Sequence, residues 1–256
     1  MAGVSTVGPT AGDDVHPSAD TPDPSSRPAL RDGPIIITVD GPAGTGKSSV
    51  SRTLAARLGL DFLDTGAMYR AATAITIDKG IHPKDSDTIV STLIDADLHF
   101  DWAQDPPAML AWMKPLNERI RDQDVTDLVS HIAGFAPVRE HLVRKQRIIW
   151  NQHPRLVSEG RDQGSVVFPE APLKFFLDAD ARVRAERRAN QLADQGTRVD
   201  IDQLASRIAE RDRLDRERAV GPLVCPEDAV VIDTSELSFD QVVERLVAKA
   251  LLVYGL

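Results

Sequence analysis

The sequence lacks the hallmarks of several protein classes. It has one cysteine, Cys225, which rules out an internal disulfide, and its six histidines show no Cys/His spacing for zinc. No apolar run approaches the roughly 20 residues that cross a bilayer, and the N-terminus has neither a basic start nor an apolar signal core. The net charge of −9 is opposite in sign to that of a typical nucleic-acid binder. We therefore expect a cytoplasmic protein that binds neither membranes nor nucleic acid.

The first 33 residues lack aromatic side chains and have little apolar content. Five prolines occur there among Ser, Thr, Gly and Asp. Such a segment cannot bury enough surface to offset the loss of chain entropy. Residues 1–33 are therefore predicted to be a disordered tail, and residues 34–256 to form the folded domain.

A glycine-rich loop follows the first apolar run, residues 35–39, and precedes a helical pattern at residues 50–58. Its sequence fits the phosphate-loop motif G-x-x-x-x-G-K-[ST], in which backbone N–H groups and the start of a helix hold phosphates. A glycine-rich turn that binds nothing is the alternative, but a bare turn does not need adjacent Gly, Lys and Ser. We expect Lys47 to contact the β and γ phosphates of ATP and Ser48 to be a Mg²⁺ ligand. The predicted nucleotide-binding residues are Gly41, Pro42, Ala43, Gly44, Thr45, Gly46, Lys47, Ser48 and Ser49.

Short apolar strands alternate with longer helical patterns along the rest of the chain. Strands are predicted near residues 35–39, 61–63, 155–158, 173–177 and 229–232. This alternation predicts an α/β fold of the P-loop NTPase type, with a parallel five-stranded sheet and helices on both faces. Between about residues 85 and 150 the pattern changes to a short antiparallel excursion, near 98–102 and 109–113, and then to helical spacing broken at Pro137. We expect a core of residues 34–84, 151–180 and 219–256, an inserted subdomain at about 85–150, and a helical lid at about 181–218.

Polar side chains follow two of the predicted strands. Thr65, Tyr69 and Arg70 come after the second strand, where a base or sugar could pack on Tyr69 and Arg70 could meet a phosphate. Taken alone, the segment slightly favours the alternative, in which Thr65 is a helix cap and Tyr69 is a core residue. Arg161 and Asp162 follow the third strand and could read sugar hydroxyls and hold a phosphate, or form a buried structural ion pair.

Ten arginines and no lysine lie between Arg182 and Arg218. Guanidinium groups bind phosphate oxygens in two-pronged fashion. Arg211, Asp215 and Arg218 fall at i, i+4 and i+7 and so share one helix face. A salt-bridged, solvated helix is the alternative, but phosphoryl transfer needs mobile positive charge and a lid that excludes water.

These segments together resemble the bacterial cytidylate kinases, which are small P-loop nucleoside monophosphate kinases. The matching residues are 39–48, 63–70, 159–162, 164–169, 171–178 and 211–218. The resemblance implies transfer of the γ-phosphoryl group of ATP to CMP or dCMP with Mg²⁺, and it implies that the insertion binds the monophosphate. Among its departures, Leu214 stands where relatives often have an arginine, with Arg213 beside it, and Gln163 replaces an aliphatic residue.

The resemblance also assigns roles to residues. Lys47, Arg187 and Arg218 would be catalytic, with Arg187 as the lid arginine near the transferred group. The residues that would bind the cytosine nucleotide are Thr65, Tyr69, Ser130, Arg139, Arg161, Asp162, Arg211, Asp215 and Arg218, with Arg211 and Arg218 on its phosphate.

Two other functions remain open at this stage. A kinase of the same class could act on UMP, AMP or another acceptor. A P-loop regulator could bind nucleotide without catalysis, although the Asn-Lys-x-Asp motif of GTPase switches is absent. We expect small nucleotides as the only partners and a monomer, since no long apolar stripe demands a second chain.

Overall fold

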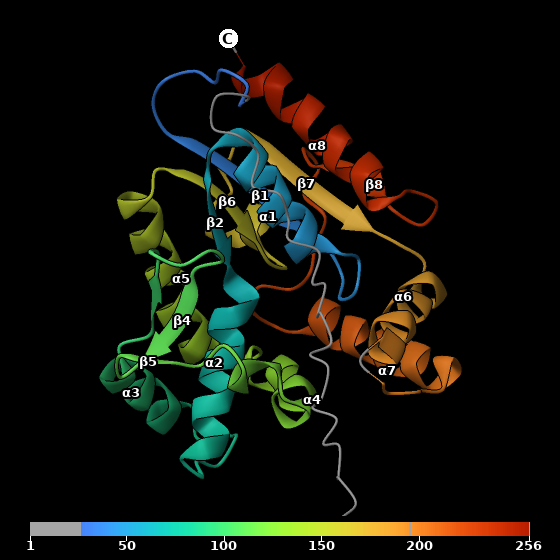
Figure 1. The fold of residues 1–256 in the computed structure, drawn as a ribbon. Helices are drawn as coiled ribbons and strands as arrows, with labels where there is room; N and C mark the ends of the chain where they lie inside the picture. The colour runs from blue at the N-terminus through green and yellow to red at the C-terminus, as the bar shows by residue number, and fades with distance from the viewer. Residues whose placement is uncertain (1–26, 195, 256) are drawn as a thin grey trace, which may run out of the picture.

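A parallel five-stranded sheet forms the centre of the computed structural model, which describes residues 27–194 and 196–255 (Figure 1). The strand order is β2-β6-β1-β7-β8, and all four neighbouring pairs are parallel. All five predicted strands are present, and each ends one residue later than predicted. Their bounds are β1 Ile35–Asp40, β2 Asp61–Asp64, β6 Arg155–Glu159, β7 Leu173–Asp178 and β8 Val230–Asp233.

Helices cover both faces of the sheet, as the sequence predicts. All six residues of β1 are buried, which is typical of a central parallel strand. Ile35, Ile37 and Val39 belong to the apolar cluster that contains α1 (Lys47–Leu58) and α8 (Phe239–Tyr254). Ile36 lies on the other face, in the cluster that contains α2 (Thr65–Asp78) and α5 (Ala136–Gln152). Alternate side chains of one strand therefore enter different cores.

The insertion contains a three-stranded antiparallel sheet, in the order β3-β4-β5, together with helices. The helical break is earlier than predicted: α4 ends at Ile132 and α5 begins at Ala136, so Pro137 lies in the first turn of α5, where proline costs nothing. Apolar residues of the insertion join the cluster beneath α2, so it has no separate core. Its remaining elements are α3 Ser86–Ala96, β3 His99–Asp101, β4 Ala108–Ala111, β5 Lys114–Pro115, η2 Arg119–Arg121 and α4 Gln123–Ile132.

The predicted lid consists of two packed helices, α6 (Ala181–Asp194) and α7 (Ile201–Glu217), beyond the carboxyl end of β7 (Figure 1). Helix α7 also contacts α4 of the insertion. A single π-helical turn, η3 (Gln163–Val167), follows β6. The carboxyl ends of β1, β2 and β6 therefore open toward both the insertion and the lid, which is where open parallel sheets place ligands.

The N-terminal prediction meets the structure only in part. Residues 1–26 lie outside the described residues. Within residues 27–33, Leu30 forms a β-bridge with Gly255, and the Arg31 N–H donates to the Tyr254 carbonyl at 2.8 Å. These residues, assigned to the tail by composition, lie against the domain instead. In the described part of the chain, no helix combines the length and apolarity that a membrane crossing requires.

Candidate active site at the carboxyl ends of the strands

The phosphate loop joins β1 to the first residue of α1, as its motif predicts. Gly41 has φ 145°, and a Cβ there would lie 2.0 Å from the Leu177 carbonyl oxygen, so only glycine lets the loop pass β7. Gly46 precedes α1 with φ 83°, and no side chain caps the helix. Nothing within 4 Å fills the space beside Gly46. The first N–H groups of α1 are therefore available to an anion.

Lys47 is buried within this loop, with 4% of its surface exposed. Its Nζ donates to the Pro42 carbonyl at 2.6 Å and to Thr45 Oγ1 at 3.4 Å, both uncharged oxygens. Burial, with the nearby Arg161, lowers the pKa of Lys47 to about 7. A polyphosphate would replace the weak carbonyl partner with a charged one.

A buried hydroxyl and carboxylate lie beside the loop. Ser48 Oγ donates to Glu159 Oε2 at 3.1 Å. Burial and the charge of Asp64 raise the pKa of Glu159 to about 7. The described residues contain no cluster of three or more His, Cys, Asp or Glu side chains suited to a metal. This donor set therefore fits Mg²⁺, which takes most of its ligands from water and substrate phosphates, and it does not fit a metal held by protein groups alone.

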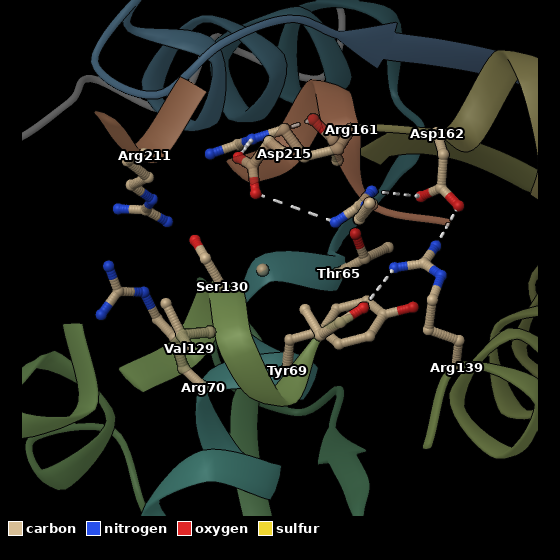
Figure 2. A pocket seen from close by; sticks show the side chains of 14 residues that line it. Thr65, Tyr69, Arg70, Val129, Ser130, Arg139, Arg161, Asp162, Arg211 and Asp215 are labelled. Carbon is tan, nitrogen blue, oxygen red and sulfur yellow. Dashed lines mark hydrogen bonds and ion pairs between the residues drawn. The ribbon is translucent and has the colours of Figure 1, made fainter. Parts of the chain in front are cut away.

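A pocket lies between α2, α4, the end of β6 and α7 (Figure 2). All nine residues predicted to bind the acceptor nucleotide line it. The complete lining is Thr65, Gly66, Tyr69, Arg70, Val129, Ser130, Ala133, Arg139, Gly160, Arg161, Asp162, Arg211, Asp215 and Arg218.

At one end of the pocket, which we call the paired end, positive and negative side chains alternate (Figure 2). Its five residues, in spatial order, are Arg139, Asp162, Arg218, Asp215 and Arg161. Arg139 pairs with Asp162, Arg218 lies 4.0 Å from Asp162 and 3.8 Å from Asp215, and the Arg161 Nε donates to Asp215 at 3.0 Å. Although burial acts to raise the pKa of Asp215, the surrounding guanidiniums lower it, so Asp215 is ionised.

Several polar atoms at the paired end have no hydrogen-bond partner among the described residues. They are Tyr69 Oη, Arg139 Nε and Arg218 Nη2. The Arg139 guanidinium lies 5.2 Å from the centroid of the Tyr69 ring. Buried polar groups without partners are costly. A flat ligand with its own donors and acceptors would satisfy them while stacking on the aromatic ring.

At the opposite end, which we call the unpaired end, the guanidiniums of Arg70 and Arg211 face each other (Figure 2). Arg70 donates to the Ile120 carbonyl at 3.1 Å and to Thr126 Oγ1 at 2.9 Å, which are uncharged. Within the described part of the chain, neither guanidinium has a carboxylate oxygen within 4.0 Å. Burial, with Arg161 nearby, lowers the pKa of Arg211 to about 10. Two facing guanidiniums that bond to no carboxylate among the described residues form a candidate site for an anion such as a phosphate.

Glu159 connects the phosphate loop to the pocket. Its side chain accepts the Ser48 hydroxyl beside the loop, and its carbonyl accepts the Thr65 hydroxyl at 2.7 Å on the pocket side. Gly160, the next residue, lines the pocket. Two anion sites therefore lie on either side of one residue. The cap of α2 is Asp64, whose carboxylate accepts the Ala67 N–H at 2.9 Å, so Thr65 is not the helix cap.

Two lid arginines that the sequence analysis singled out lie outside the acceptor pocket. Arg187 does not line the pocket: it donates to Thr234 Oγ1 at 3.1 Å and to the Thr234 carbonyl after β8. Its predicted role near the transferred group stays a prediction. Arg213, beside Leu214, faces solvent and pairs with Glu210 and Glu217.

The buried residues Arg184 and Asp212 were missed by the sequence analysis. They form an ion pair at 2.7 Å. No local signal distinguishes Arg184 from the other lid arginines, because only its packing against the phosphate loop sets it apart. Asp212 stands inside the 211–218 segment, and its position in that motif was the one available clue.

A family model and the curated relatives identify one family. A family model described as cytidylate kinase matches residues 37–251, a span that contains the phosphate loop and every lining residue of the pocket. A cytidylate kinase from Methylococcus capsulatus is 44% identical over 209 residues, covering 82% of this chain and 93% of the relative. Cytidylate kinases from Corynebacterium efficiens and Corynebacterium glutamicum are each 42% identical, covering 85% and 84% of this chain and 95% and 94% of the relatives.

Proposed function

Because the chain belongs to the cytidylate kinase family, we propose that it transfers the γ-phosphoryl group of ATP to CMP or dCMP, giving ADP and CDP or dCDP. The reaction belongs to pyrimidine nucleotide metabolism. The observation that carries the proposal is the pair of anion sites on either side of Glu159, one at a phosphate loop and one between two unpaired arginines. Phosphoryl transfer needs a donor and an acceptor phosphate held in line, and no covalent enzyme intermediate is required.

The donor side uses the loop and Lys47. Loop N–H groups and the start of α1 bind the phosphates of ATP, and Lys47 exchanges the Pro42 carbonyl for phosphate oxygens. Ser48 would hold Mg²⁺ together with ATP oxygens, and the ion would neutralise phosphate charge. Glu159 orients the Ser48 hydroxyl for that role.

The acceptor side uses both ends of the pocket. The paired end receives the cytosine and the sugar, because its unpartnered donors and the Tyr69 ring match a flat polar heterocycle. The unpaired end receives the monophosphate, since Arg70 and Arg211 supply positive charge that is bonded to no carboxylate. Arg218 is the exception to this division: it lies at the paired end, and we assign its Nη2, which has no hydrogen-bond partner among the described residues, to a phosphate oxygen. Ser130 and Thr65 contribute hydroxyls from α4 and α2.

An acceptor panel tests the proposal. Release of ADP is measured with ATP and Mg²⁺ in the presence of CMP, dCMP, UMP, AMP or GMP. We expect kcat/KM for CMP or dCMP to exceed that for AMP and GMP by at least about a hundredfold, because a site built for hydrogen bonding rejects mismatched partners strongly. Lys47→Ala is the control for contaminating kinase and should abolish turnover. Faster turnover of AMP, or ADP release that needs no acceptor, contradicts the proposal.

The setting of the reaction is also a proposal. We infer a cytoplasmic enzyme, since its ATP and nucleoside monophosphate substrates are cytoplasmic metabolites. We also infer a monomer, since the sequence has no long apolar stripe that demands a second chain. We retain the division into a core, a monophosphate-binding insertion at about 85–150 and a lid at about 181–218, which is supported by the placement of α4 and α7 on two sides of the pocket.

A further inference from the structure

Two buried lid residues outside the pocket carry opposite charges. Arg184 lies on α6 and Asp212 on α7, with 4% and 2% of their surfaces exposed. The Arg184 Nη2 lies 2.7 Å from the Asp212 Oδ2. Neither lines the acceptor pocket. A buried ion pair contributes little to stability compared with apolar packing of the same volume, because both charges lose their hydration. Its presence therefore calls for another explanation.

Both side chains bind the same residue of the phosphate loop. The Ala43 N–H donates to Asp212 Oδ1 at 3.3 Å, and the Arg184 Nη1 donates to the Ala43 carbonyl at 2.8 Å. Together with the ion pair, these bonds close a ring that contains one loop residue and one residue from each lid helix. A Cβ on Gly44 would lie 3.5 Å from the Arg184 Cβ, so the next loop residue also packs on α6.

The same ring connects the loop to the acceptor pocket. Asp212 follows Arg211 directly and precedes Asp215 by three residues on α7, and both of these line the pocket. The Arg184 Nε donates to the Ala179 carbonyl at 3.0 Å, which fixes α6 to the segment after β7. A shift of α7 would therefore move Arg211 and the loop residue Ala43 together.

We propose that Arg184 and Asp212 are positioning residues that hold the phosphate loop in register with the acceptor arginines on α7. They contact neither substrate. They act by fixing the position of Ala43 relative to Arg211, and hence the position of the ATP phosphates relative to the acceptor phosphate. The expected effect on turnover rests on the proposed kinase function. The bonds of Arg184 and Asp212 to Ala43 are a property of the protein without nucleotide.

The test uses the double variant Arg184→Met/Asp212→Leu in the full chain. Removing both charges leaves no unpaired buried charge, so we expect the melting temperature to stay within a few degrees of the wild-type value. We expect kcat to fall about a hundredfold, while KM for ATP and for CMP changes less than about threefold, because misplacement by about 1 Å costs alignment and not binding. Hydrogen exchange of the amides in residues 41–46, measured without nucleotide, should accelerate.

Two further variants make the result specific. Arg213→Met/Glu217→Leu removes an exposed pair of the same kind from α7 and should change neither kcat nor loop exchange. Arg184→Lys keeps the charge and one bond and should recover at least a tenth of the wild-type kcat.

Each contrary result has a distinct meaning. A folded double variant with wild-type kcat, or one with unchanged exchange in residues 41–46, overturns the inference. A low melting temperature with unchanged loop exchange identifies the pair as merely structural. If wild-type protein does not phosphorylate CMP, the proposed function fails, and the nucleotide-free exchange measurement still decides whether the loop is tied to the lid.

Discussion

The two ends of the acceptor pocket differ in whether their arginines are paired with carboxylates. At the paired end, Asp162 and Asp215 pair with three guanidiniums before any ligand arrives. At the unpaired end, Arg70 and Arg211 have only uncharged partners or none. A neutral base and sugar need donors and acceptors held in place without excess charge. A phosphate needs excess positive charge, and this charge is unfavourable in the protein without ligand. The difference separates recognition of the nucleoside from recognition of its phosphate.

The largest expected effect comes from removing one cation of the unpaired end. We expect Arg211→Ala to lower kcat/KM for CMP about a thousandfold, because a charge-assisted contact to the acceptor phosphate is lost. The same change should leave the melting temperature unchanged or slightly higher, since it removes a cation that is buried near Arg161 and Arg70. Steady-state kinetics and thermal unfolding measure the two effects.

The control for this variant is Arg213→Ala, two residues further along α7. Arg213 is exposed and bonded to Glu210 and Glu217, so its loss should change kcat/KM by less than about twofold. A marked drop in melting temperature for Arg211→Ala, with kcat/KM preserved, would show that both ends of the pocket are structural.

The family resemblance predicted nine of the fourteen residues that line the pocket, but not the end of the pocket to which each belongs. The spacing of Arg211, Asp215 and Arg218 on one helix sufficed to place them on one face. Whether an arginine there is paired depends on Arg139 and Asp162, which come from α5 and from the end of β6. Such pairing is set by packing between segments that are distant in the chain, and no local pattern encodes it.

The partners of two lid arginines could not be predicted from local sequence either. Arg184 and Arg187 lie three residues apart in one helix, in nearly the same local sequence. One reaches the loop at Ala43, 141 residues earlier, and the other reaches Thr234 after β8. By contrast, the strands were predicted to within one residue of their observed ends, because short apolar runs bounded by polar residues are a local signal.

A smaller effect, on stability, is expected from breaking the paired end. Asp162→Ala leaves the buried Arg139 and the nearby Arg218 without a shared carboxylate. We expect the free energy of unfolding to fall by about 3 kcal/mol, since an uncompensated buried charge remains. Urea unfolding measures the change. Glu217→Ala, which removes an exposed carboxylate bonded to Arg213, should cost less than about 0.5 kcal/mol. Equal losses in the two variants would abolish the distinction between the ends.

The smallest expected effect concerns Lys47 on the donor side, which resembles the arginines of the unpaired end. Lys47 also has only uncharged hydrogen-bond partners, and burial lowers its pKa to about 7. Bound phosphates should raise this pKa toward or above its ordinary value, so above pH 7 the binding of ATP must take up a proton. The dissociation constant for ATP should therefore increase as the pH rises from about 7.5 to 9, by up to tenfold per pH unit.

Calorimetry over this pH range, in two buffers of different ionisation enthalpy, measures both the affinity and the proton uptake. The titration of Glu159 must be distinguished from that of Lys47, because burial raises the pKa of Glu159 to about 7 as well. In Glu159→Gln the pH dependence should persist and shift to lower pH, since the negative charge that helps to keep Lys47 protonated is gone. In Lys47→Arg it should disappear, because a guanidinium stays charged throughout. If the affinity of the wild-type protein for ATP does not change with pH, the prediction is wrong. Lys47 then resembles the arginines of the paired end instead.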